Sequence, residues 1–224
     1  MRTSAGALVS HGVTFGNDIP IWGHKVLVHE TMHTFGLADL YHGGGTVPIA
    51  DASTHEYVGD WGVMGDILGS APELFTWERW KLGWVDDAQI ACAVAAGTTE
   101  TTLAPVEAGG STLAVVVPTS EHTAIVAENR QPTGHDADAC KGGVLVYRVD
   151  TAVDTLEGPI HVVNAHPFGS RACSGLEAAP MDLETPATPG TSVFTDESAG
   201  ITISLVAAHD GQWDVAVRRD HASG

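Results

Sequence analysis

The chain has 224 residues, of which 43% are hydrophobic, and its formal net charge is −18 at pH 7. This composition is typical of a folded globular protein that buries a sizeable core. The acidic balance argues against nucleic acid or an anionic membrane surface as a partner, because both attract basic patches. No apolar run approaches the roughly 18 residues that would suggest a membrane span.

The first predicted elements are a β-strand and a helix. Residues 6–15 are apolar and β-branched, and a Gly-Asn-Asp turn follows them. The helix is predicted from about Lys25 to Phe35, and Gly36 stands where a glycine commonly ends a helix.

An ordered loop, a tight turn and a second helix are expected next. The loop covers residues 42–60, and the turn is DWGVMGD, residues 60–66. The helix is predicted over about residues 72–82, because Pro72 suits the start of a helix and apolar residues follow at helical spacing.

After Val85 helical periodicity disappears and short β-branched runs alternate with turn residues. This pattern predicts an all-β sandwich-like domain. The fold class is therefore α+β, with one domain over residues 1–86 and a β domain over residues 87–224. The strands are predicted over residues 98–105, 111–118, 122–130, 143–150, 159–165, 191–195, 200–208 and 212–218.

The stretch HETMHTFGLADLY, residues 29–41, carries the chemistry. His29 and His33 lie four positions apart, so on a helix they share one face about 6 Å apart along the axis. Both imidazoles can then reach one Zn²⁺ ion. Glu30, beside them, can reach a water molecule at such a site without binding the metal, which is the position of a general base.

A catalytic zinc site usually has three protein ligands, and Asp39 is the candidate for the third. Gly36 can adopt the positive φ that turns the chain back after the helix, and Asp39 follows three residues later. The alternative is that Asp39 is only a turn residue.

With these residues in view, the sequence resembles the immune inhibitor A family of secreted bacterial metallopeptidases, which are metzincin-like. The motif H-E-x-x-H-x-x-G-L-x-D-x-Y of that family is matched over residues 29–41, and a methionine turn is matched around Met64. The segment LFTWERWKLGW, residues 74–84, and the β-rich stretches at 128–137 and 143–150 also resemble it.

The resemblance implies a zinc endopeptidase that acts on proteins or peptides. His29, His33 and Asp39 would bind zinc, Glu30 would be the catalytic base, and Met64 would lie beneath the metal. The resemblance also implies secretion, although residues 1–10 lack the pattern of a signal peptide.

The catalytic region is expected to be partial: a strand, the zinc helix, the Met-turn and a helix. Relatives have a longer stretch of sheet and helix before the zinc helix than the 28 residues found here. Apolar residues of the helix are therefore expected to be exposed. The alternative function is a truncated, inactive metzincin-like protein that acts as a binding or structural module through its β domain.

Several further expectations concern side chains outside the motif. Cys140 and Cys173 either form a disulfide that leaves Cys92 free, or all three cysteines are unpaired. Calcium is a second candidate ion, at Asp136 and Asp138, although a solvated turn is favoured there. Four tryptophans are expected to pack the second helix onto the β domain, and four histidines are expected to be bystanders. These are Trp61, Trp77, Trp80 and Trp84, and His11, His24, His42 and His55; His55 or Tyr57 could still face the cleft.

Overall fold

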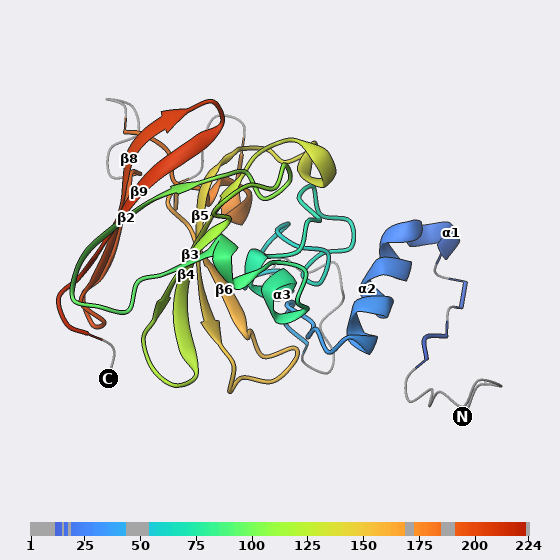
Figure 1. Ribbon diagram of the computed structural model, residues 1–224. Coiled ribbons are helices and arrows are strands. Elements are labelled where there is room, and N and C mark those ends of the chain that lie inside the picture. The colour runs from blue at the N-terminus through green and yellow to red at the C-terminus, as the bar shows by residue number, and fades with distance from the viewer. Residues whose placement is uncertain are drawn as a thin grey trace.

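The computed structural model describes residues 12–14, 16–17, 19–43, 54–168, 173–184 and 191–222. Most of the strand predicted over residues 6–15 lies outside these ranges, and residues 12–14, which lie inside them, are not in a strand. The middle of the loop predicted over residues 42–60 also lies outside the described residues. Figure 1 shows the described chain as two β-sheets with the helices and a looped segment on one side. None of the helices in these ranges is long and apolar enough to cross a membrane.

The helix predicted from about Lys25 to Phe35 is confirmed, while its role in binding zinc stays a prediction. It is α2 (His24–Thr34), and a short helix α1 (Ile19–Trp22) precedes it. Gly36 has a φ of 90°, which glycine adopts at little cost. The N–H of Gly36 donates to the carbonyl of His33 at 3.0 Å, and the N–H of Leu37 donates to that of Met32 at 3.2 Å. These two bonds satisfy carbonyls at the end of the helix and reverse the chain.

Large apolar side chains of the two N-terminal helices are exposed, as predicted for the zinc helix. Leu27 is 44% exposed, Val28 39% and Phe35 58%, and Ile21 on α1 is 69% exposed. The opposite side of α2 packs inward through Val26 and Met32.

The turn predicted at residues 60–66 is confirmed, but the helix after it is shorter than predicted. The N–H of Gly65 donates to the carbonyl of Gly62 at 2.9 Å, which closes the turn. Helix α3 spans Thr76–Lys81 instead of residues 72–82. Pro72 does not start it, because the Pro72 carbonyl accepts a hydrogen bond from the N–H of Val63 at 3.1 Å and keeps the chain extended.

All eight predicted strands are present, and a ninth, β1, was missed because it has only three residues. A five-stranded sheet has the order β1-β3-β4-β5-β6, and a four-stranded sheet has the order β2-β9-β8-β7. All neighbours are antiparallel except β1 and β3. The bounds are β1 (Ile90–Cys92), β2 (Gly97–Leu103), β3 (Ala114–Pro118), β4 (Thr123–Arg130), β5 (Gly143–Asp150), β6 (Ile160–Val163), β7 (Val193–Asp196), β8 (Ile201–His209) and β9 (Gln212–Arg219), with 3₁₀ turns η1 (Asp87–Gln89), η2 (Gly134–Asp136) and η3 (Gly175–Ala178).

The five-stranded sheet is the middle layer of the molecule (Figure 1). On β3, Val115 and Val117 point into the core shared with the four-stranded sheet. Ala114 and Val116 point into a second core, on the other face. Successive side chains of a strand alternate between faces, so a strand covered on both sides reads as a continuous apolar run.

The second core joins the two parts of the chain that the sequence separates near residue 86. It contains Trp61, Met64 and Phe75 from the first part and Leu145 and Tyr147 from the middle sheet. The division into domains over residues 1–86 and 87–224 stays a prediction, but the two parts bury apolar surface against each other.

The predicted packing role of the tryptophans is confirmed for three of the four. Trp61 is 1% exposed, and its indole N–H donates to the carbonyl of Leu176 at 2.8 Å. Trp77 and Trp80 are partly buried and pack edge to face, with ring centroids 5.6 Å apart. The prediction is wrong for Trp84, which is 54% exposed and contacts only the ring of Phe35 among the aromatic pairs of the described chain.

A buried ionic network connects the looped segment to the middle sheet. The Arg130 guanidinium donates to Asp136 Oδ2 at 2.7 Å and to Glu128 Oε1 at 3.0 Å. Glu128 Oε2 in turn accepts from the N–H of Thr76 at 2.7 Å, and Asp136 Oδ1 accepts from the N–H of Glu73 at 2.9 Å. A solvated turn at Asp136 is therefore wrong: this carboxylate is buried, with partners on both oxygens. Calcium binding there stays untested.

Glu78 makes stability depend on pH. Burial raises its pKa to about 8 from an ordinary value of 4.5, with a further contribution from Glu128. The folded protein then retains a proton that the unfolded chain releases, so the free energy of unfolding falls as pH rises from about 4.5 to 8. Glu78→Gln keeps an acceptor for the N–H of Phe75 and removes this proton.

We expect the variant to gain about 1.4 kcal/mol in unfolding free energy relative to wild type for each pH unit between about 5.5 and 7.5. Urea unfolding at three pH values measures this difference. A constant difference across that range would show that Glu78 is ionised in the folded protein.

Cys140 and Cys173 form a disulfide, and Cys92 is an exposed free thiol. The first of the two alternatives for the cysteines, a Cys140–Cys173 disulfide with Cys92 free, is therefore confirmed.

Candidate metal centre

Helix α2 presents His29 and His33 on one face, as the four-residue spacing predicts. Their ring centroids are 4.8 Å apart. His29 is buried, and the His33 side chain is 30% exposed. The His29 ring is thus enclosed by the protein, whereas the His33 ring is partly accessible to solvent.

The turn after Gly36 brings Asp39 back to both histidines. Asp39 Oδ1 lies 3.1 Å from His29 Nε2 and 3.2 Å from His33 Nε2. Ligand atoms around a tetrahedral zinc ion, at bond lengths of about 2.0–2.2 Å, are roughly 3.3 Å apart. Among the described residues, this is the group of three possible ligands that comes together, with ligand atoms within 4.8 Å of one another.

Both histidines are held by their other ring nitrogens. His29 Nδ1 lies 2.8 Å from the carbonyl of Val63, and His33 Nδ1 lies 2.9 Å from the carbonyl of Leu37. A carbonyl only accepts, so each Nδ1 carries a proton and donates it. In a neutral ring this leaves an Nε2 lone pair directed at the cluster, which is the form that binds a metal.

The donor set fits a cation. Two imidazole lone pairs and a carboxylate oxygen that face one another are stabilised by positive charge between them, from protons or from a metal ion. Burial lowers the pKa of His29, but the hydrogen bonds to Asp39 and Val63 outweigh it and raise the pKa overall. Burial raises the pKa of Asp39, but the His29 hydrogen bond and the charge of His33 lower it overall.

The turn that contains Met64 lies directly behind the cluster. The carbonyl that holds His29 belongs to Val63, and the carbonyl of Met64 accepts from the N–H of Leu40 at 2.9 Å. Met64 itself is fully buried in the second core. The turn thereby holds the His29 ring and the chain that carries Asp39, while a role of the Met64 side chain toward a metal stays a prediction.

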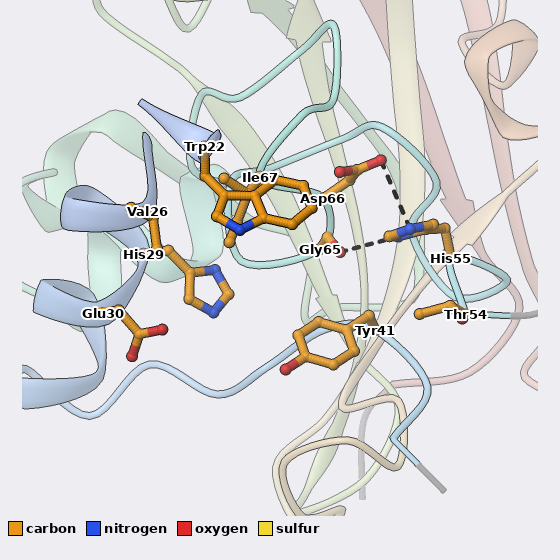
Figure 2. A pocket seen from close by; sticks show the side chains of 10 residues that line it. All are labelled: Trp22, Val26, His29, Glu30, Tyr41, Thr54, His55, Gly65, Asp66 and Ile67. Atoms are coloured by element: carbon orange, nitrogen blue, oxygen red, sulfur yellow. Dashed lines mark hydrogen bonds and ion pairs between the residues drawn. The ribbon is translucent and has the colours of Figure 1, made fainter. Parts of the chain in front are cut away.

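Glu30 lines a cavity of about 230 Å³ next to the cluster. Figure 2 shows its carboxylate beside the ring of His29, with the hydroxyl of Tyr41 turned toward the same space. Glu30 is not one of the converging ligands. Its role as a general base stays a prediction.

Tyr41 also belongs to the site. In the sequence it was only the last residue of the family motif, and no role was predicted for it. Its ring stacks on that of His29 at a centroid distance of 6.3 Å. Burial, together with the nearby carboxylates of Asp39 and Glu30, raises the pKa of Tyr41 to about 12. Its hydroxyl therefore remains protonated at neutral pH, and it donates toward the Asp39 carboxylate, which contributes to the raised pKa.

His55 lines the cavity, which was one of the two possibilities left open for His55 and Tyr57. Its Nδ1 lies 3.1 Å from the carbonyl of Gly65, and its Nε2 lies 3.7 Å from Asp66 Oδ2 (Figure 2). Tyr57 is not among the residues that line this cavity; its ring stacks on that of His42 and packs at a tilt against that of His161.

The other histidines expected to be bystanders do not join the cluster where the structure describes them. His24 is exposed at the start of α2. His42 Nδ1 pairs with Glu56 Oε1 at 2.7 Å, and His11 lies outside the described residues.

The β domain also reaches the site. The connection between β5 and β6, residues 151–159, places the Thr155 hydroxyl 2.8 Å from the backbone N of Asp39 and 3.2 Å from its Oδ2. The two residues are 116 positions apart, and an exposed threonine in a hairpin carries no local signal of such a contact. Sequence reasoning had no means of finding it.

Comparison of the chain with models of known protein families gave no match, and comparison with curated proteins gave none either. The geometry of the site therefore carries the functional argument.

Proposed function

We propose that the protein is a zinc-dependent endopeptidase that hydrolyses peptide bonds in proteins or peptides. The observation that carries the proposal is the convergence of His29, His33 and Asp39 next to the cavity that Glu30 lines. The resemblance to the immune inhibitor A family of metzincin-like peptidases supports it, since the converging residues are those of the motif.

In this proposal His29, His33 and Asp39 hold the zinc ion, and Met64 belongs to the apolar base of the site. Bound zinc would supply Lewis acidity toward water and a peptide carbonyl. Glu30 takes a proton from the attacking water and later gives it to the leaving amine. The Tyr41 hydroxyl, which interacts with Asp39 in the structure, would redirect its hydrogen bond to the carbonyl oxygen as negative charge develops there.

The proposal includes secretion. The Cys140–Cys173 disulfide supports it, because such bonds form and persist mainly in oxidising compartments. The strongly acidic composition is compatible with an extracellular protein and opposes binding to nucleic acid.

The proposal is tested with the purified full chain and a fluorescently labelled casein. We expect about one zinc ion per chain by elemental analysis, and casein cleavage that stops after dialysis against a chelator and returns with stoichiometric zinc. Retained zinc without any cleavage would instead support a binding or structural module, and a chain with neither would contradict the metal site.

A further inference from the structure

The third ligand of the cluster is held by the β domain. Asp39 lies in an irregular segment after α2, where no helix or strand fixes its side chain. Its carboxylate must nevertheless present one defined oxygen to the two histidines. The contacts of residues 39–43 with the β5–β6 connection supply this constraint.

A single hydroxyl binds Asp39 twice. Thr155 Oγ1 accepts from the backbone N–H of Asp39 at 2.8 Å and donates its one proton to Oδ2 at 3.2 Å. The hydrogen bond from Thr155 to Oδ2 restricts rotation of the Asp39 carboxylate. The other oxygen, Oδ1, then faces His29 and His33.

The backbones of the two segments are joined on both sides of this contact. The N–H of Leu156 donates to the carbonyl of Asp39 at 3.1 Å, and the N–H of Gly43 donates to the carbonyl of Leu156 at 3.2 Å. Leu156 has a φ of 69°, a conformation that costs a non-glycine residue free energy and persists only where the surroundings impose it.

The close approach also depends on Gly43. A Cβ at this position would lie 2.7 Å from the Cβ of Leu156, a distance that rotation of the leucine side chain cannot relieve. The two segments thus fit only with glycine at position 43 and an unusual backbone at position 156.

We infer that the β5–β6 connection is part of the metal centre and that Thr155 is a positioning residue that orients Asp39 for zinc. The inference rests on the proposed zinc site. It also gives the β domain a role in the site. In metal sites generally, a residue that hydrogen-bonds to a ligand fixes the geometry of that ligand and raises metal affinity.

The test compares zinc affinity in Thr155→Val, Thr155→Ser, Thr151→Val and wild type, measured by competition with a chromophoric chelator. Valine has nearly the shape of threonine and lacks both hydrogen bonds, whereas serine keeps the hydroxyl. Thr151 is the matched control, because its hydroxyl donates to the carbonyl of His122 at 3.1 Å in the same connection.

We expect Thr155→Val to weaken zinc binding about 10-fold, the lower end for an outer-shell partner, because water can replace part of an exposed contact. Its Co²⁺ complex should show a shifted visible spectrum, since the carboxylate geometry changes. Thr155→Ser and Thr151→Val should match wild type in both measurements.

Thr155→Ala, measured alongside, removes the hydroxyl without the β-branch and should behave as Thr155→Val does. Wild-type zinc affinity and an unchanged Co²⁺ spectrum in both variants would overturn the inference alone. A wild-type chain that binds neither Zn²⁺ nor Co²⁺ would overturn the proposed metal site as well, so the two failures are distinguishable.

Discussion

Glu30→Gln is expected to lower kcat/KM for casein cleavage by at least about 100-fold while the chain keeps its zinc. Glutamine has the size of glutamate but cannot accept a proton from water at neutral pH. Glu30 lines the cavity without joining the ligand cluster, so the substitution leaves all three ligands in place. Elemental analysis and the initial rate of cleavage, measured on the same preparation, separate chemistry from metal binding.

The control for this variant is Glu121→Gln, which makes the same change at an exposed position in the β domain. It should retain the wild-type rate. If Glu30→Gln also retains near-normal activity while the wild type is active, Glu30 is not the general base.

His33→Ala is expected to abolish stoichiometric zinc binding, and proteolysis with it. Removal of a ligand should weaken binding by more than the 10–100-fold typical of losing an outer-shell partner. His33 is better suited to this test than His29, because its side chain is 30% exposed and its truncation leaves a smaller defect in the core.

His24→Ala is the matched control for the ligand variant, since His24 lies on the same helix and outside the cluster. It should bind zinc as wild type does, and thermal unfolding should show that both variants are folded. Stoichiometric zinc in the His33→Ala protein would rule out the proposed site.

The sequence by itself determined the local features of the site and the type of most elements. Four-residue spacing on a helix places His29 and His33 on one face whatever surrounds them, and Gly36 ends that helix because its φ of 90° suits glycine. The strands were predictable because their signal is also local. Runs of β-branched residues between turn residues favour the extended conformation, and the tertiary structure did not override this preference.

Element boundaries were decided by contacts between distant segments. Helix α3 begins at Thr76 because the carbonyl of Pro72 bonds the N–H of Val63 in the preceding turn. Strand β1 has too few residues for a pattern and exists through its pairing with β3. Asp136 resembles a solvated turn residue in sequence, yet Arg130 neutralises it inside the core.

Only the tertiary structure decided how Asp39, the proposed third ligand, is oriented. Spacing after Gly36 brings Asp39 within reach of the histidines, but this spacing alone does not fix the orientation of the carboxylate. Its orientation is selected by Thr155 and Leu156, more than a hundred residues further along the chain. Which oxygen faces the histidines depends on hydrogen bonds formed after the β domain has packed, and these leave no periodicity or motif in the sequence.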